Sequence, residues 1–256
     1  MGSRSSSATT ARKARVPLDR ALSKLGLASR TEARALITAG RVRVDGAIAT
    51  DIARMVIPER VAITIDNTRR ERPELEVILL HKPRGVVTTK SDPQGRPTVY
   101  DSLTGLDTHV VPVGRLDLAT SGLLILTNDT RLADWLTDPA TAIARVYLVT
   151  VRGRVAPETT RKLERGFAVD GEHLAAVSAV VRKASGRESH LVVTLDEGKN
   201  REIRRLLAAA GHPVTRLRRA QYGGLELGTL APGKWRRVTD AEISRAFPGA
   251  PKRRHR

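Results

Sequence analysis

The chain has 256 residues, of which 40% are hydrophobic, and its 45 lysines and arginines outnumber 27 acidic residues to give a formal net charge of +18. The absence of cysteine excludes disulfides, a thiol nucleophile and thiolate-bound metals, and no apolar run is long enough to span a bilayer. We therefore expect a cytoplasmic protein that binds a polyanion, of which nucleic acid is the commonest. An anionic membrane is a weaker alternative, because the basic segments lack a wide apolar face with Trp or Phe.

Composition and pattern divide the chain into consecutive parts. In the larger, C-terminal part the expected strands are not separated by regular single crossovers. This favours an α+β fold with a mixed, largely antiparallel sheet over a doubly wound one. The expected parts are a disordered basic arm (1–15), a small N-terminal α/β unit (16–66), a linker (67–74), the large domain (75–246) and a basic tail (247–256).

The small N-terminal unit is predicted to contain two helices followed by a β-hairpin. Leucines at near-helical spacing predict a first helix that ends at Gly26. An S-x-x-E capping box from Ser29 to Glu32 predicts the second helix, which ends at Gly40. The following RVRVDGAIA alternates apolar and basic residues and carries Asp-Gly, which predicts a hairpin with that pair in its turn.

Nearly all of LDRALSKLGLASRTEARALITAGRVRVDG resembles the S-four-type RNA-binding domain, named for a small-subunit ribosomal protein. In that family the second helix and the adjoining hairpin edge present basic groups to RNA. The alternative is that these arginines only make a helix face soluble, but their clustering and sign favour RNA. The resemblance implies RNA contacts from Arg30, Arg34, Arg41 and Arg43.

The large domain alternates strand-like and helix-like segments. Asn128 or Asp129 is expected to cap the first helix, Gly211 to end the third, and Thr239 with Glu242 to form a capping box on the last. The predicted strands lie in LEVILLHKP, HVVPVG, LLILTN, RVYLVTVRG and SHLVVTLDEG, and the predicted helices in DTRLADWLTD, APETTRKLERG, KNREIRRLLAAAGHPV and TDAEISRAF.

Several kinds of chemistry lack their motifs. There is no P-loop, no G-x-G-x-x-G after a strand and no H-E-x-x-H. The six histidines are scattered without metal-ligand spacing, so no metal site is expected. Ser121 stands in T-S-G rather than G-x-S-x-G, which makes it a weak candidate for a nucleophile.

Asp117, in VGRLDLATSGLLILTND, is the remaining candidate. A carboxylate can attack an anomeric carbon, but retaining glycosidases need a second carboxylate nearby to handle water. Asp129, the nearest later acid, lies beyond a predicted strand, about 20 Å away or more. A single acid with an arginine partner suits a reaction that breaks a glycosidic bond without water. The alternative is that Asp117 caps a turn or pairs with Arg115 for structural reasons.

Four ordered motifs resemble the bacterial ribosomal-RNA pseudouridine synthases of the single-site, small- and large-subunit type. They cover nearly all of residues 75–230, so that with the N-terminal unit the resemblance spans most of the chain. This implies the pseudouridine-synthase fold for the large domain. The motifs are HKPRGVVTTKSDPQGRPTVYD, VGRLDLATSGLLILTND, PATAIARVYLVTVRG and EGKNREIRRLLAAAGHPVTRLRRAQYGGL.

The resemblance implies roles for particular residues. Asp117 matches the catalytic aspartate, which attacks the ribosyl carbon or, in an older proposal, the uracil ring. Tyr147 matches the tyrosine that stacks on the target base, and Arg204 the basic residue that pairs with the aspartate. Arg115 matches an arginine suggested to fill the gap left by the flipped base. From pattern alone, Tyr147 could instead be a core aromatic, and Arg204 part of a solvated helix face.

Further basic residues of the motifs are expected to contact RNA phosphates rather than perform chemistry. Lys82 and Arg84 belong to the first motif, and Lys199 and Arg201 open the basic cluster that runs to Arg219. Together with Arg115 they complete the RNA-binding residues that we expect in the large domain.

The resulting hypothesis is an enzyme that isomerises one uridine in ribosomal RNA, with the large-subunit RNA favoured. Such an isomerisation needs no cofactor, and none is expected. The expected partner is ribosomal RNA or a precursor ribosomal particle, and the expected state is a monomer. The alternatives are a non-catalytic RNA-binding assembly factor, and a base-excising glycosylase, which should show a second acid beside Asp117.

Overall fold

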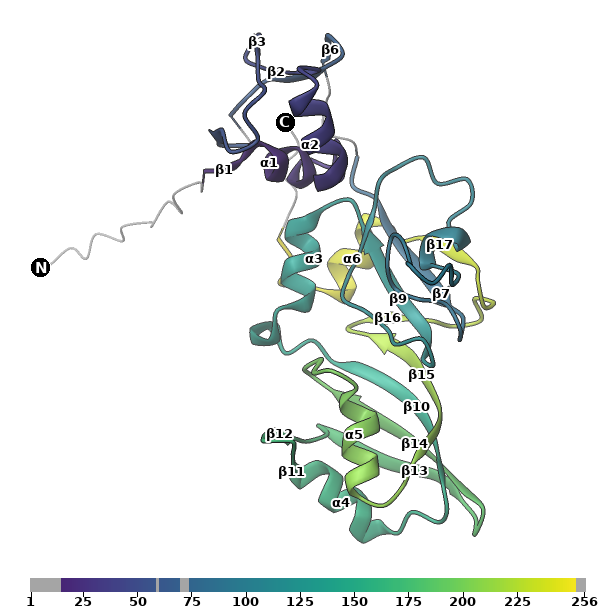
Figure 1. The fold of residues 1–256 in the computed structure, drawn as a ribbon. Helices are drawn as coiled ribbons and strands as arrows, with labels where there is room; N and C mark the ends of the chain where they lie inside the picture. Colours follow the sequence, from purple (N-terminus) through teal and green to yellow (C-terminus); the bar gives the residue numbers. More distant parts are fainter. Residues whose placement is uncertain (1–14, 59, 70–73, 252–256) are drawn as a thin grey trace, which may run out of the picture. The chain divides into compact units, whose positions relative to one another are not determined.

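The structure, a computed structural model, describes residues 15–58, 60–69 and 74–251. The chain forms two compact units, residues 1–74 and 75–256, which we describe separately (Figure 1). Residues 1–14 of the expected arm and 252–256 of the expected tail lie outside the described residues. No helix in the described ranges is both long and apolar enough to cross a membrane.

The N-terminal unit packs two helices against short strands. Its core joins apolar residues of both helices and the strands, among them Leu22, Ile37 and Val44. The predicted capping box is confirmed, because Ser29 accepts from the Glu32 backbone N–H at 3.2 Å. The elements are β1 (Val16–Pro17), α1 (Leu18–Lys24), α2 (Arg30–Thr38), β2 (Val42–Val44), β3 (Ala47–Ile48), β4 (Met55–Val56), β5 (Ile63–Ile65) and β6 (Thr68–Arg69), with sheet order β3-β2-β5-β6 and a separate β1–β4 pair.

Two expected boundaries need correction. The segment expected as a linker begins inside the N-terminal unit, because β6 pairs with β5 through Thr68 and Arg69. The segment expected as a tail begins inside the core of the large unit, because Phe247 is only 3% exposed and its ring meets Tyr222 edge-on at 6.3 Å. The first segment is polar throughout and the second ends in a basic run, so neither sequence reveals the strand pairing or the packing at its start.

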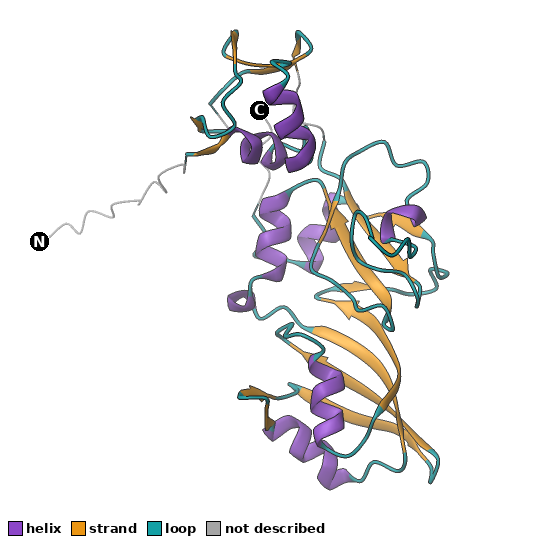
Figure 2. Ribbon diagram, viewed as in Figure 1, coloured by secondary structure: helices purple, strands orange, loops and turns teal. Residues whose placement is uncertain are grey.

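The large unit is built on a nine-stranded sheet (Figures 1 and 2). Seven strands follow the order β13-β14-β10-β15-β9-β7-β17, and the other two, β16 and β8, pair with β15 and β9. The β9–β15 ladder is parallel and the other ladders in the described sheet are antiparallel, as expected. The strands are β7 (Val77–Lys82), β8 (Val111–Pro112), β9 (Ser121–Thr127), β10 (Arg145–Arg152), β13 (Ser178–Ala184), β14 (Glu188–Leu195), β15 (Val214–Tyr222), β16 (Leu225–Glu226) and β17 (Trp235–Arg237).

Helices cover both faces of this sheet. One core cluster joins α4 and α5 to β10 and β14, through residues such as Leu163, Ile203 and Val149. A second cluster joins α3 and α6 to β7 and β9. The remaining elements are η1 (Val99–Ser102), α3 (Thr130–Thr137), η2 (Pro139–Thr141), α4 (Pro157–Arg165), the hairpin β11 (Phe167–Val169) and β12 (Glu172–Leu174), α5 (Glu202–Ala209) and α6 (Asp240–Ala246).

Gly122 allows β9 to approach β15 closely. It pairs with Arg219 of β15 on one side and with Lys82 of β7 on the other. Its φ is +111°, and a Cβ atom built on it would lie 2.2 Å from the carbonyl oxygen of Arg219. Only glycine fits such a contact. The T-S-G sequence is therefore the point where the loop that carries Asp117 enters the centre of the sheet.

Candidate active site

The large unit contains a cavity of about 390 Å³ near the parallel pair of strands. This volume lies within the range of small-molecule sites in proteins. Its wall combines the loop before β9, the inner residues of β10 and β15, and the turn that leads into α5. The lining includes Arg115, Asp117, Thr120, Arg145, Tyr147, Leu195, Glu197, Lys199, Arg201, Glu202, Ile203, Leu217, Arg219 and Tyr222.

Asp117 lies in the loop between β8 and β9, and its side chain is 31% exposed. Its carboxylate oxygen Oδ2 lies 3.7 Å from Nη1 of Arg201. Its backbone carbonyl accepts from the Thr120 N–H at 2.9 Å, which closes a turn. The carboxylate is thus reachable from the cavity while the backbone around it is fixed.

Lys82 has a different place from the one expected. Its side chain is buried, and its ammonium donates to the carbonyl oxygens of Pro83, Asp117 and Thr120 at 3.0, 3.1 and 2.8 Å. A fully enclosed ammonium cannot reach a phosphate, so the expected RNA contact was wrong. Burial lowers the pKa of Lys82 to about 8, against the attraction of Asp117. Lys82 holds the Asp117 loop and contributes positive charge beneath it.

Arg204 was expected to pair with Asp117, but both Arg204 and Arg201 contact the Asp117 loop. Arg204 donates to the carbonyl oxygen of Ala119 at 3.0 Å, and burial, followed by the repulsion of Arg201, lowers its pKa from the ordinary value. Asp117 opposes this shift. The ion pair that Asp117 forms, however, is with Arg201. Arg201 precedes α5 in the left-handed region, at φ +49°, a conformation typical of functional sites for a non-glycine residue.

Tyr147 points toward the helix-covered face of β10 and lines the cavity. It is 8% exposed and packs within the same apolar cluster as Leu217 and Leu195. Its hydroxyl forms no hydrogen bond with the residues that the structure describes. Tyr147 thus belongs to the core and also lines the cavity, and its expected role in stacking on the target base stays a prediction.

Three residues of the site were missed in the sequence. The guanidinium groups of Arg145 and Arg219 each lie 5.0 Å from the ring centre of Tyr222, within the range of cation–π contacts. The Tyr222 hydroxyl donates to the Leu136 carbonyl at 2.6 Å, and Arg219 Nε to that of Leu123 at 2.7 Å. Arginines in a strand look like surface residues, and only the register of β10 and β15 turns them inward.

Two further acids, Glu197 and Glu202, also line the cavity, so Asp117 is not the lone acid that chain distance indicated. Asp129, by contrast, caps α3, as one of the two expected alternatives, accepting from the Arg131 N–H at 2.9 Å. Glu197 follows the end of β14 and Glu202 begins α5, so both come from a segment far from Asp117 in the sequence. In the described residues no group of three or more His, Asp or Glu could hold a metal ion.

The other basic residues expected at RNA differ in their freedom. Arg84 and Arg115 are exposed. Lys199 is tied down, because its ammonium donates to Glu197 Oε1 at 2.5 Å and to the carbonyl oxygen of His173 at 2.9 Å. Lys199 therefore shapes the turn before α5, whereas the two arginines remain free to meet a ligand.

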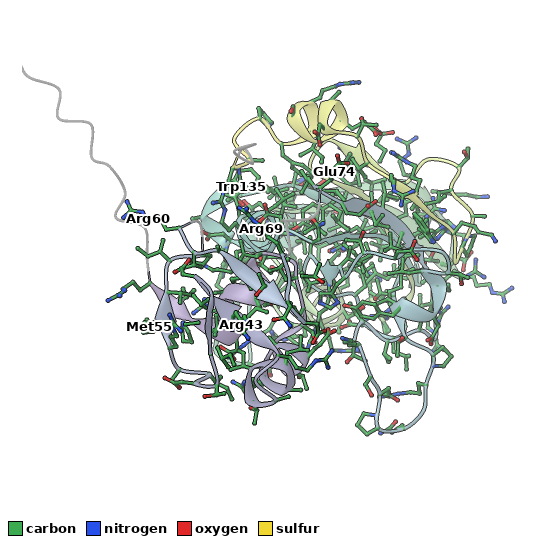
Figure 3. All side chains as sticks on the ribbon, turned by 90° about the horizontal axis from the view of Figure 1, so that it is seen from above. Arg43, Met55, Arg60, Arg69, Glu74 and Trp135 are labelled. Carbon is green, nitrogen blue, oxygen red and sulfur yellow. The ribbon has the colours of Figure 1, made fainter. Side chains whose placement is uncertain are left out.

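In the N-terminal unit Arg30, Arg34 and Arg41 are exposed and Arg43 is half-buried, and all four are held by hydrogen-bond partners. Arg30 and Arg34 pair with Asp19 at 3.3 and 2.9 Å; this acid is buried, and although burial raises its pKa, hydrogen bonds led by Arg34 lower it overall. Arg41 makes two 2.7 Å bonds to Asp66, and Arg43 donates to Asn67 and Gly46. Figure 3 labels Arg43 together with two exposed arginines of this unit, Arg60 and Arg69.

A reachable carboxylate flanked by arginines and a tyrosine, in a chain with a basic helix–hairpin unit, defines an enzyme that acts on nucleic acid. The model of the RNA pseudouridylate synthase family matches residues 76–209, and that of the S4 domain matches residues 16–60. The chain therefore belongs to the RNA pseudouridylate synthase family and carries an S4 domain, as the sequence indicated.

Individual relatives agree with this assignment. The ribosomal large subunit pseudouridine synthase B of Bacillus subtilis (strain 168) is 36% identical over 230 residues, which cover 89% of this chain and 94% of that protein. The protein of the same name from Salmonella typhi is 38% identical over 234 residues, covering 89% and 80%. A crystal structure of a pseudouridylate synthase aligns with a TM-score of 0.63 at 25% identity, covering 91% of this chain and all of that one. The expected fold is confirmed.

Proposed function

We propose that this enzyme isomerises a specific uridine to pseudouridine in ribosomal RNA, with the large-subunit RNA as the favoured substrate. The observation that carries the proposal is Asp117, a reachable carboxylate beside Arg201, in a cavity that Tyr147 also lines. The relatives named for the large subunit support the choice of RNA.

The substrate uridine must leave its stack, because its glycosidic bond is not accessible inside a helix. The Tyr147 ring then provides a face for the uracil, and Leu195 and Leu217 complete an apolar wall. Arg115, exposed at the mouth of the cavity, can occupy the gap that the flipped base leaves. These contacts place the ribosyl carbon C1′ near Asp117.

The reaction then needs only groups of the enzyme and the uridine. A carboxylate oxygen of Asp117 forms a bond to C1′, the C1′–N1 bond breaks, and its electron pair leaves with the uracil. The uracil turns, its C5 bonds to C1′, and the Asp117–C1′ bond breaks with its pair returned to the carboxylate. C5 loses a proton and N1 gains one, so that the product is an isomer of the substrate.

The cations around Asp117 have two separate tasks. Arg201 faces the carboxylate and supplies a positive charge 3.7 Å from it. Arg204 and Lys82 bind backbone carbonyls of the same loop, at Ala119, Asp117 and Thr120, and so fix the direction of attack. Replacing Arg204 or Lys82 should therefore shift the position of the Asp117 loop, whereas replacing Arg201 should remove a positive charge beside the Asp117 carboxylate.

We also propose that the protein acts as a monomer in the cytoplasm, on ribosomal RNA or on a precursor of the large subunit. The proposal is tested by mapping pseudouridines in ribosomal RNA from cells that lack the protein and from the same cells after its gene is restored. Loss of one site and its return with the gene would support the proposal. Unchanged pseudouridines in every ribosomal RNA would refute it and favour a non-catalytic assembly factor.

A further inference from the structure

Glu202 is a buried acid of the cavity wall that the reaction above does not use. It is the first residue of α5 and only 3% exposed. Its Oε2 accepts from the Lys199 backbone N–H at 3.1 Å. Its Oε1 is enclosed and meets no donor among the described residues. An ionised carboxylate in this position would bury an unmet charge, which is costly.

Glu197 is the acid linked to Glu202 through Lys199, whose ammonium donates to Glu197 and whose backbone N–H donates to Glu202. A protonated Glu202 carboxyl can donate to the Glu197 carboxylate, whereas two ionised carboxylates have no proton to share. Burial raises the pKa of Glu202 to about 7, and Glu197 adds to the rise. Burial acts on Glu197 in the same direction, but the Lys199 hydrogen bond leads the opposing effects and leaves its pKa lowered. Glu202 is therefore the acid of the two whose protonated form is favoured.

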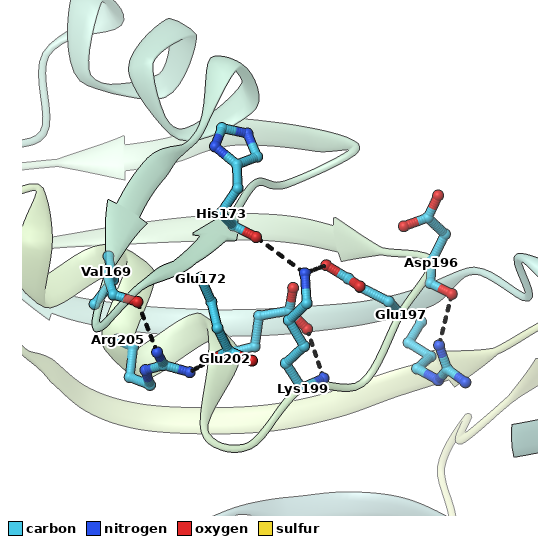
Figure 4. A network of polar contacts seen from close by, with 9 residues as sticks. Val169, Glu172, His173, Asp196, Glu197, Lys199, Glu202 and Arg205 are labelled. Carbon is cyan, nitrogen blue, oxygen red and sulfur yellow. Dashed lines mark hydrogen bonds and ion pairs between the residues drawn. The ribbon is translucent and has the colours of Figure 1, made fainter. Parts of the chain in front are cut away.

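The charged groups around this pair hold the turn from both sides, as Figure 4 shows. Lys199 donates to Glu197 and to the His173 carbonyl of β12. Arg145 of β10 donates to the Asp196 carbonyl at 2.8 Å. On the far side Glu172 is engaged by Arg205 at 2.6 Å. Lys199 and Arg145 are the cations that face Glu197, and each has a fixed partner.

The turn between the two glutamates ends in Arg201, the residue that reaches Asp117. Arg201 stands directly before Glu202 and adopts the left-handed region at φ +49°. A non-glycine residue holds that conformation only where its surroundings impose it. The bond that Glu202 accepts from the Lys199 backbone N–H closes the turn at the position next to Arg201.

We propose that Glu202 is a positioning residue: its protonated carboxyl, bonded to Glu197, closes the turn 197–201 and holds Arg201 beside Asp117. The inference rests on the proposed function for its effect on catalysis, and on the carboxyl pair alone for its effect on the turn. When both carboxyls ionise they repel, the turn opens, and Arg201 leaves Asp117. The enzyme then loses turnover while the RNA-binding unit is unaffected.

The test variant is Glu202→Gln, because an uncharged amide of the same shape donates to Glu197 at every pH. Glu158→Gln is the matched control, since Glu158 lies in the first turn of α4 with a side chain 67% exposed. The wild-type folded state binds the Glu202 proton more strongly than the unfolded state, so it loses stability as pH rises from 4.5 to about 7. Glu202→Gln should melt above the wild type at pH 8, with the gap closing toward pH 5. A gap that does not change with pH overturns the carboxyl pair.

Hydrogen exchange reads the turn directly. After correction for intrinsic rates, amides of residues 197–201 should exchange several-fold faster at pH 8 than at pH 6 in the wild type, and equally at both in Glu202→Gln. Single-turnover rates at saturating RNA should fall about 5- to 10-fold across the same range in the wild type and stay level in the variant, with RNA affinity unchanged. Identical pH–rate profiles in the two proteins would make Glu202 purely structural and overturn the positioning role.

The two proposals fail in different ways. If wild-type protein forms no pseudouridine in any ribosomal RNA, the proposed function fails, while melting and exchange still decide whether the pair closes the turn. Glu202→Ala removes both hydrogen bonds and should lower the rate about 10-fold at pH 6, where Gln retains it. A full rate for the alanine variant at pH 6 would also overturn the inference.

Discussion

Arg201 Nη1 lies 3.7 Å from Asp117 Oδ2, although the two residues come from separate segments of the large unit. The turn before α5 brings the Arg201 guanidinium to the carboxylate. Arg204, three residues further along the chain, donates to the backbone carbonyl of Ala119 in the Asp117 loop. Charge and position at Asp117 are thus supplied by different arginines, and the difference can be measured.

We predict that Arg201→Ala lowers the single-turnover rate by about 10- to 100-fold, because one stabilising cation beside the reacting carboxylate is lost. The side chain is 53% exposed, so the melting temperature should hardly change. Arg201→Lys should recover part of the rate. Arg161→Ala on the exposed face of α4 is the control. A variant at position 201 with the wild-type rate would remove Arg201 from the site.

Gly122→Ala should destabilise the large unit by roughly 2–5 kcal/mol, from a positive φ and an overlap with the backbone. The added Cβ would lie 2.2 Å from the Arg219 carbonyl oxygen, and backbone cannot yield as a flexible side chain can. Gly186→Ala is the control, because a Cβ there meets nothing within 4 Å. Urea unfolding measures both. Equal stability of the two variants would contradict the close approach of β9 to β15.

The lowered pKa of Lys82 predicts that the free energy of unfolding rises with pH. The folded state lowers its pKa from 10.5 to about 8, so between these values the unfolded chain holds the proton and the folded chain does not. Stability from this residue then increases with pH across that window, by at most about 3 kcal/mol. Lys82→Met removes the titration. Urea unfolding of both proteins from about pH 7.5 to 10 should show their difference shifting in favour of the wild type, and a constant difference would count against the buried lysine.

The fold could be predicted to a large extent because it rests on local signals. Both predicted capping boxes form: the Ser29 and Thr239 hydroxyls accept hydrogen bonds from the backbone N–H groups of Glu32 and Glu242. The Asp45-Gly46 turn has the positive φ values of a tight hairpin, +52° and +84°. Short edge strands such as β6 escaped prediction, since two residues carry no period.

The site was predictable only in part, since it depends on register and on contacts between distant segments. Asp117 and Tyr147 stand in motifs and line one cavity. That Arg201 rather than Arg204 pairs with Asp117, and that Lys82 is buried, depends on where each chain segment crosses the sheet. The inward turn of Arg219 follows from its pairing with Tyr147, which no pattern in β15 announces.

RNA binding by the N-terminal unit should depend steeply on salt, since cations release counterions from the RNA. Arg41→Gln with Arg43→Gln should weaken binding and lower the slope of log affinity against log salt by about 2. This pair is preferable to Arg30 and Arg34, whose loss would strand the buried Asp19. The measurement is the RNA affinity of both proteins at a series of low to moderate salt concentrations. A slope equal to that of the wild type would exclude these two arginines from the RNA surface.

Asp117→Asn tests the central claim most directly. The loop is fixed through backbone bonds, from Lys82 to the Asp117 carbonyl and from Thr120 to the same oxygen, so the variant should fold and bind RNA as the wild type does. Its amide cannot form the bond to C1′. We predict that pseudouridine formation in the target ribosomal RNA falls by a factor of about 10³ or more, with the melting temperature and RNA affinity unchanged. Pseudouridine formed by Asp117→Asn at a rate near that of the wild type would contradict Asp117 as the nucleophile.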